Sequence, residues 1–457
     1  MADSMNDRKS RFSPIQILTL GIFLLILGGS VLLSLPISAA SGSSVGFVTA
    51  AFTATSSVCV TGLVVVPTGV AFSLFGQIVI ILLIQVGGIG FMTMAAMLWI
   101  IIKRKITLSD RIVMSETYNL SSSSGVVRLA KNVFRVTLVC ELLGALILSI
   151  RFIPDFGVYR GIWYSLFHSI SAFCNAGIDI LSNGDSVTRY VGDPLVCITL
   201  MALIILGGFG FAVILDLIEK RRFRKTRLHT KLVVVISLGL VLIGGVFFYI
   251  CEYSNPDTLG DPSLNQGEKI LAGFFQSVTT RTAGFNSIDQ GAMTGASKMM
   301  SMILMFIGAS SASTGGGIKT TTFALLLLTV FSAIRGKSDL NIGRRRISVQ
   351  QASRAFVLAS LCLILVIAGT MMLLISQSAV GTTVSIEDAM FECFSAFGTV
   401  GLTTGITPEL NTFSRFVVMF LMFAGRVGPL TLMMAIAEKH GAKKTSFRLP
   451  EEQILIG

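Results

Sequence analysis

Long apolar runs separated by short polar connections dominate the chain. A helix needs about 20 consecutive apolar residues to cross a bilayer, and eight runs meet this length. They cover residues 14–37, 71–102, 132–152, 194–218, 232–252, 298–334, 354–378 and 412–437. The pattern predicts an all-α polytopic membrane protein with eight transmembrane spans.

The polar connections predict the orientation of these spans. Most of the 36 basic residues lie at the two ends and in the connections after the second, fourth and sixth runs. Lys and Arg accumulate in cytoplasmic loops, so both termini are expected in the cytoplasm. The other connections are acidic, with Asp179, Asp257 and Glu409 as examples. An acidic outer mouth raises the local cation concentration, although acidic outer loops also occur without such a role.

The outer connections contain an internal repeat. Segments 52–63, 167–178, 274–285 and 391–402 align without gaps, and each has a Phe ten residues before a Gly. The glycines are 115, 107 and 117 residues apart. Four copies at nearly constant spacing indicate a repeated unit of span, short amphipathic segment, glycine turn and span. The glycines are Gly62, Gly177, Gly284 and Gly401.

These segments are predicted to be re-entrant pore loops around one pseudo-fourfold ion pathway. Irregular backbone is tolerated at membrane depth where it is buried or lines a wet cavity, and backbone carbonyls there can replace the hydration shell of a cation. The negative C-terminal ends of the four short helices would favour a cation as well. Besides the glycines, the candidate filter residues are Val60, Thr61, Asn175, Ala176, Thr282, Ala283, Thr399 and Val400. Thr399-Val400-Gly401 matches part of the potassium-channel filter motif.

Glycines also cluster inside the runs that follow the first two loops. Small residues allow membrane helices to approach closely. We therefore interpret these glycines as packing positions. They are Gly87, Gly88, Gly90, Gly207, Gly208 and Gly210.

The sixth run differs, because Gly308–Thr322 interrupts it with Ser, Thr and three consecutive glycines. Each glycine costs a helix about 1 kcal/mol relative to Ala. A broken helix next to a filter is a candidate gate, and a fixed packing kink is the alternative. The candidate gate residues here are Gly308, Ser311, Ser313, Thr314, Gly315, Gly316 and Gly317.

Lys319 and Arg426 complete the candidate gate, because intramembrane charges are costly and usually face a cavity or a partner. Arg426 is expected to hold the gating segment closed by bonding its carbonyls. The alternative is a structural ion pair with Glu141 or Asp216.

Two further buried charges, Arg281 and Glu392, are expected to brace the filter, and they are candidates to pair with each other. His168 and Asn175 are interpreted as local hydrogen-bond partners rather than ion ligands.

Composition excludes several classes of protein. The 457 residues are 53% hydrophobic and 13% charged, whereas a soluble domain has about 25% charged residues. None of the seven cysteines forms a Cys-x-x-Cys pair, and no phosphate-binding loop or nucleophile motif is present. We therefore expect no enzyme, no bound cofactor and no transition metal. The net charge of +12 suits cytoplasmic loops, a partner's acidic face or membrane lipids better than nucleic acid.

Over residues 14–440 the chain resembles the membrane subunits of the Ktr/Trk/HKT superfamily of cation transporters. It looks most like KtrB-type members, since Trk-type members usually carry two additional spans before the first repeat. The resemblance implies K⁺ uptake with Na⁺ as a suspected activator, a homodimer, and a cytosolic KtrA-like ring that binds ATP or ADP. The family's filter glycines match the four glycines above, and the resemblance further implies that a glycine at position 62 favours potassium over sodium.

The predicted organisation follows the repeats. It comprises a cytoplasmic N-terminus (1–13), repeat 1 (14–102), a cytoplasmic loop (103–130), repeat 2 (131–220), repeat 3 (221–334, broken at 308–322), a cytoplasmic loop with repeat 4 (335–437) and a cytoplasmic C-terminus (438–457). The first run is too long for a signal peptide, and a bacterial inner membrane is expected. The alternatives are a Trk-like or sodium-conducting transporter, or a coupled transporter of another solute.

Overall fold

The computed structural model describes residues 13–102, 106–117, 125–181, 186–311, 313–336, 340–342, 345–429, 431 and 433. Apart from Ser13, the predicted cytoplasmic termini 1–13 and 438–457 lie outside the described residues. The structure is almost wholly helical. Its one described sheet pairs β1 (Leu340–Ile342) antiparallel with β2 (Arg345–Ile347), so that Ile342 lies opposite Arg345.

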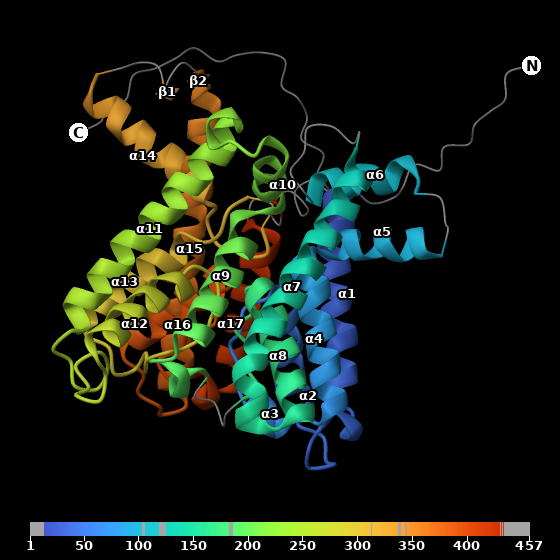
Figure 1. Cartoon of the computed structure of the whole chain (residues 1–457), viewed down its shortest axis with the longest axis vertical. Helices are drawn as coiled ribbons and strands as arrows, with labels where there is room; N and C mark the ends of the chain where they lie inside the picture. The colour runs from blue at the N-terminus through green and yellow to red at the C-terminus, as the bar shows by residue number, and fades with distance from the viewer. Residues whose placement is uncertain are drawn as a thin grey trace, which may run out of the picture.

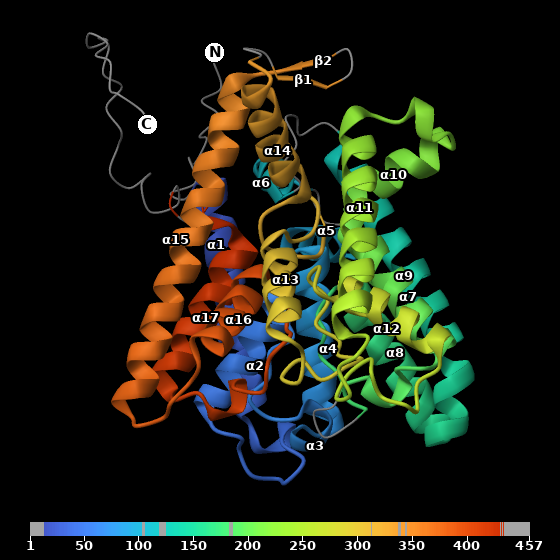
Figure 2. The same ribbon diagram turned by 90° about the vertical axis from the view of Figure 1, so that its left-hand side faces the viewer.

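Four long helices run along the molecule (Figures 1 and 2). They are α1 (Pro14–Ser34), α7 (Val126–Phe156), α11 (Leu228–Glu252) and α15 (Val349–Ala379). Each is long and apolar enough to cross a membrane. Their outer faces expose large apolar side chains such as Leu146 and Ile250, which in a bilayer contact lipid.

Each long helix is followed by a short helix that ends inside the protein. These are α2 (Phe47–Cys59), α8 (Val158–Phe173), α12 (Gln266–Thr279) and α16 (Ile386–Gly398). The last two turns of all four are largely buried. Each repeated segment of the sequence covers the last turns of one of these helices and the residues that follow it. We call the four helices the pore helices.

A third helix follows each pore helix. These helices are α4 (Leu74–Ile89), α9 (Pro194–Phe209), α13 (Gly295–Phe306) and α17 (Thr412–Val427). The first three are each followed by another helix, namely α5 (Phe91–Ile101), α10 (Phe211–Lys220) and α14 (Thr320–Ile334). Short helices occupy the connections, namely η1 (Pro36–Ser38), α3 (Thr68–Ala71), α6 (Leu108–Thr117), η2 (Thr188–Tyr190), η3 (Phe223–Lys225) and η4 (Thr407–Glu409).

The third helices are shorter than the sequence predicts. Continuous spans over 71–102, 194–218 and 412–437 are wrong, because α4, α9 and α17 end at Gly90, Gly210 and Gly428. These glycines have φ values of 92°, 87° and 90°, a region that other residues resist. At Gly210 the chain bends by 96° between α9 and α10. Gly90 and Gly210 therefore end helices, a role that the packing interpretation did not include.

Other glycines of these clusters do pack closely, as predicted. A methyl group on Gly87 would collide with the carbonyl oxygen of Val58, and one on Gly207 with that of Phe173. One on Gly88 would lie 2.6 Å from Cys174 Sγ, whereas Gly208 has no neighbour closer than 3.5 Å. The packing interpretation thus holds for Gly87, Gly88 and Gly207. These contacts bring two of the third helices, α4 and α9, close to the ends of pore helices.

Candidate ion filter and gate

The chain leaves all four pore helices through the same backbone turn. A residue other than glycine adopts a left-handed conformation, and a glycine with positive φ follows two residues later. The pairs are Val60 and Gly62 (57° and 104°), Asn175 and Gly177 (60° and 63°), Thr282 and Gly284 (71° and 83°), and Thr399 and Gly401 (50° and 95°). Positive φ in a non-glycine residue is uncommon and often occurs at functional sites.

These four turns, which we call the filter turns, meet in a closed ring. A methyl group on Gly62 would lie 2.6 Å from the carbonyl oxygen of Ala176 and 3.2 Å from the Cα of Gly401. The other three glycines repeat this contact with the next turn along the chain, and the last returns to the first. Their contacts are Gly177 with Ala283 O, Gly284 with Val400 O, and Gly401 with Thr61 O. The structure therefore brings all twelve candidate filter residues together.

Backbone bonds hold the residue before each glycine against its pore helix. The amide of Thr61 donates to Ser56 O (2.8 Å) and that of Val400 to Ser395 O (2.9 Å). The corresponding amides in the other two repeats donate in the same way, Ala176 to Ser171 O (2.7 Å) and Ala283 to Thr279 O (3.0 Å). The amides therefore point toward the helix ends, while the carbonyls of these residues approach the neighbouring glycines around the ring.

The segment 307–319, which we call the gating loop, lies against one side of this ring. The amide of Gly316 donates to Thr399 Oγ1 (2.9 Å), and a methyl group on Gly315 would collide with Thr282 Oγ1. The amide of Ser310 donates to Gly208 O (3.0 Å). The gating loop therefore contacts the filter turns of repeats 3 and 4 and the third helix of repeat 2.

The gating loop folds back on itself. Gly308 lies so close to Gly316 that a methyl group on it would collide with Gly316 O. Further hydrogen bonds form within the loop and with the adjoining helix ends. They join Ile318 N to Phe306 O (3.2 Å), Lys319 Nζ to Gly315 O (2.7 Å), Ser313 Oγ to Ser310 O (2.6 Å), Thr320 Oγ1 to Ser310 Oγ (3.0 Å), and Ser311 Oγ with Thr321 Oγ1 (3.1 Å). All nine candidate gate residues except Arg426 belong to this loop.

Arg426, on α17, connects the gating loop to α4. Its guanidinium donates to the carbonyl oxygens of Thr314 and Gly87, and to that of Gly88 at 3.4 Å. Among the described residues it pairs with neither carboxylate named above, so the ion-pair alternative is wrong.

Both of those carboxylates have other partners. Glu141 accepts from Gln85 Nε2 (3.0 Å). Asp216 accepts from the Arg227 amide (2.9 Å) and Thr230 Oγ1 (2.6 Å).

Arg281 and Glu392 do not brace the filter as a pair. Arg281 donates to Ser237 O (3.1 Å). Glu392, which is fully buried, accepts from Thr403 Oγ1 (2.8 Å) and from Thr407 Oγ1. Glu392 therefore connects pore helix α16 to the chain that returns after Gly401. Sequence reasoning missed the two threonines, although their spacing of four residues was visible.

His168 and Asn175 both have hydrogen-bond partners within the protein, while their interpretation as partners rather than ion ligands stays a prediction. His168 Nδ1 lies 2.7 Å from Tyr164 O. The Asn175 amide nitrogen is placed to donate to Ala172 O (3.0 Å) and Ile204 O (3.2 Å), while its oxygen accepts from Thr282 Oγ1 (3.1 Å). This contact joins the turns of repeats 2 and 3 beside the left-handed residues Asn175 and Thr282.

Comparison with known proteins identifies the family. Residues 24–446 match the family model "TrkH: Cation transport protein". The chain is 44% identical to Ktr system potassium uptake protein B of Bacillus subtilis, covering 98% of this chain and 97% of that protein. It is 40% identical to the potassium/sodium uptake protein NtpJ of Enterococcus hirae, covering 98% of both chains.

The fold agrees with these similarities. The crystal structure of the potassium transporter TrkH from Vibrio parahaemolyticus superposes with a TM-score of 0.72 at 16% identity, covering 94% of this chain and 86% of that one. The resemblance predicted from the repeats and the filter glycines is thereby confirmed. The chain belongs to the TrkH family of cation transport proteins.

Proposed function

We propose that this protein takes up K⁺ across a bacterial inner membrane through the ring formed by the four filter turns. The closed contact of the four glycines is the observation that carries the proposal. Such a ring needs glycine at each contact, because any side chain would occupy the space of a neighbouring carbonyl. Relatives at 44% and 37% identity, from Bacillus subtilis and Vibrio alginolyticus, are named potassium uptake proteins, which supports K⁺ as the substrate.

The pathway is formed by four repeats of span, pore helix and span, making eight spans in all. Carbonyl oxygens of Thr61, Ala176, Ala283 and Val400 replace the hydration shell of the entering ion. The C-terminal ends of the pore helices add negative potential at the same place.

The gating loop closes this pathway. It touches the filter turns at Thr282 and Thr399, so an ion that leaves the ring on this side meets the loop. Arg426 fixes the closed position by bonding the carbonyl of Thr314, and its charge raises the barrier for a cation. Conduction therefore requires the loop to move and its bonds to break.

Regulation comes from outside this chain. Relatives named after the Ktr system support assembly with other components. In this proposal the protein forms a homodimer, has both termini in the cytoplasm and binds a KtrA-like ring that carries ATP or ADP, while Na⁺ activates uptake. Because the Enterococcus hirae relative is named for both potassium and sodium, Na⁺ conduction is the second candidate function.

Rubidium uptake by cells that lack their own potassium uptake systems tests the proposal. Wild-type protein is expected to restore uptake, and Gly401→Asp is expected to abolish it, because the carboxylate would enter the ring. Gly405→Asp is the matched control, since Gly405 has positive φ but no neighbour within 4 Å. If both variants transport at the wild-type rate, the ring is not the pathway. Parallel assays with the cytosolic partner, with Na⁺ and with ²²Na⁺ separate the second candidate from the first.

A further inference from the structure

A large apolar cavity lies between the third and fourth repeats, beside the gating loop. It has a volume of about 790 Å³ and is enclosed by α13, α14, α15 and α16, which pack together in Figure 2. Its walls include Met302, Ile303, Phe306, Leu363, Met390 and Phe394. Ligand-binding cavities usually have volumes of about 300–1,000 Å³, so its size suits a bound molecule.

The cavity leads from the surface of the protein to the gating loop. At its mouth Met299 and Ile386 are 62% and 66% exposed, whereas Ile307 and Ile318 at its floor are only 6% and 3% exposed. The twelve-residue helix α13 forms one wall and is about 18 Å long at 1.5 Å per residue. A hydrocarbon core is about 30 Å thick, so the floor lies at the depth of lipid chains.

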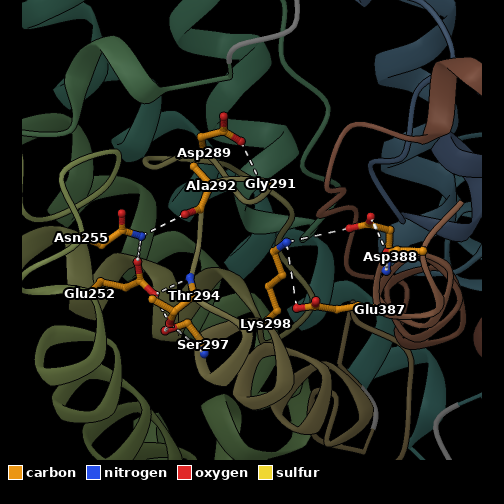
Figure 3. A network of polar contacts seen from close by, with 11 residues as sticks. Glu252, Asn255, Asp289, Gly291, Ala292, Thr294, Ser297, Lys298, Glu387 and Asp388 are labelled. Atoms are coloured by element: carbon orange, nitrogen blue, oxygen red, sulfur yellow. Dashed lines mark hydrogen bonds and ion pairs between the residues drawn. The ribbon is translucent and has the colours of Figure 1, made fainter.

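The mouth carries both signs of charge (Figure 3). Lys298 Nζ lies 4.0 Å from Glu387 Oε1 and 3.9 Å from Asp388 Oδ1. Among the described residues that line the cavity, Glu387 alone is ionisable, and its side chain remains 43% exposed. A head group with an ammonium near Glu387 and a phosphate near Lys298 would complement this arrangement. An anionic head group without an ammonium would meet two carboxylates and a single lysine.

We propose that this cavity binds one acyl chain of a phosphatidylethanolamine molecule from the surrounding bilayer. The apolar walls exclude water, and the open mouth on an apolar outer face makes lipid the adjacent solvent. The head group then lies between Lys298 and Glu387. The acyl chain packs on Ile307 and Ile318, which belong to the gating loop.

The bound chain has a consequence for the gate, and this part rests on the proposed function. The amide of Ile318 donates to Phe306 O (3.2 Å), so the two arms of the interrupted helix are tied at the floor of the cavity. An acyl chain filling the space behind them opposes outward movement of Ile318 and stabilises the closed loop. Uptake therefore depends on the ethanolamine-lipid content of the membrane.

Native mass spectrometry of the purified full-length protein tests binding without any transport assay. With added phosphatidylethanolamine or phosphatidylglycerol, the wild type is expected to retain one ethanolamine lipid. Ile303→Trp and Leu363→Trp fill the cavity from two different helices and are expected to lower retention about tenfold. Leu146→Trp, on the exposed face of α7, is the matched control and keeps wild-type retention. Glu387→Gln is expected to reduce the preference for ethanolamine about fivefold, as for an exposed ion pair.

Unchanged retention in both filled variants, or equal retention of the two lipids by the wild type, overturns the proposal. Loss of a dimer in the filled variants, with lipid retention unchanged, shows that a second copy occupies the cavity and also overturns it. Rubidium flux in proteoliposomes is then expected to vary with ethanolamine-lipid content in the wild type but not in Leu363→Trp. Selective lipid retention without any rubidium flux contradicts the proposed function alone.

Discussion

Glycine has two different roles in this protein, and Gly62 and Gly405 separate them. Both have a φ of 104°. A side chain is strained at either position, but only at Gly62 would it also enter the contact between neighbouring filter turns. Backbone strain and loss of the ring are therefore separable effects.

We expect Gly62→Ala to lower rubidium uptake about tenfold or more, and Gly405→Ala to leave it nearly unchanged. The added methyl group would lie 2.6 Å from Ala176 O, and overpacking of this kind costs about 1–3 kcal/mol. Initial uptake rates at equal membrane expression measure the effect. Equal rates in the two variants would show that space at position 62 is unimportant.

The four filter glycines were predictable because the repeat marks them, whereas the roles of the glycines inside the spans were not. Gly87 and Gly90 belong to one cluster, yet Gly87 packs against Val58 and Gly90 ends a helix. The difference lies in φ, which depends on how the following helix is held by the rest of the protein. The partners of Arg426 could not be identified from the sequence either. Arg426 bonds backbone carbonyls, and every residue has a carbonyl, so residue type gives no indication of the partner.

At the scale of elements, three third helices end at a glycine with left-handed φ. Gly210 and Gly239 provide a direct comparison. Gly210 breaks α9 from α10 with a φ of 87°, while Gly239 lies inside the continuous helix α11 with no neighbour within 4 Å.

The same substitution is expected to have opposite effects at these two sites. Gly210→Ala should lower the free energy of unfolding by about 1–2 kcal/mol, the cost of a left-handed conformation. Gly239→Ala should raise it by about 0.5–1 kcal/mol, because alanine favours the helix. Thermal unfolding of the purified protein in detergent measures both. A stabilising effect at Gly210 would contradict the bend.

Arg426 bonds the gating loop through the carbonyl of Thr314, and the proposed gate makes this bond testable. Deletion of residues 311–317 is expected to raise cation flux, because nothing then covers the ring. Arg426→Ala should raise it as well, since the bonds to Thr314 and Gly87 are lost. Arg426→Lys should lie between wild type and Arg426→Ala, because an ammonium keeps the charge but lacks the rigid planar fork with which a guanidinium reaches separate carbonyls.

Rubidium efflux from proteoliposomes compares these variants. Unchanged or abolished flux in a well-folded deletion variant would show that the loop is a fixed structural kink. Wild-type flux in Arg426→Ala would remove Arg426 from the gate.

On the scale of the whole molecule, the ring joins all four repeats. If K⁺ binds at the ring, it binds only the folded state, and a ligand at a hundred times its dissociation constant stabilises a protein by about 2.7 kcal/mol. We therefore expect potassium chloride to raise the melting temperature relative to choline chloride at the same ionic strength. Gly401→Asp is expected to lose this difference. An equal shift in the variant would place the stabilising ion elsewhere.

Much of the fold was predictable because its repeats are long and apolar. The four long helices, the pore helices and the break at residues 308–322 all have clear sequence signals. The breaks at Gly90, Gly210 and Gly428 have no such signal in the sequence. The surrounding residues remain apolar, and an apolar run of that length is equally suited to one straight helix. The apolar cavity was also invisible, since its walls come from four helices that only the fold brings together.

The order of contacts around the ring has a consequence for how the protein is made. Gly401 meets the carbonyl of Thr61, so the ring closes only when the last repeat reaches the first. A nascent chain with three inserted repeats has three filter turns and lacks Arg426. The closed ring and Arg426, which bonds the gating loop, are therefore complete only at the end of synthesis.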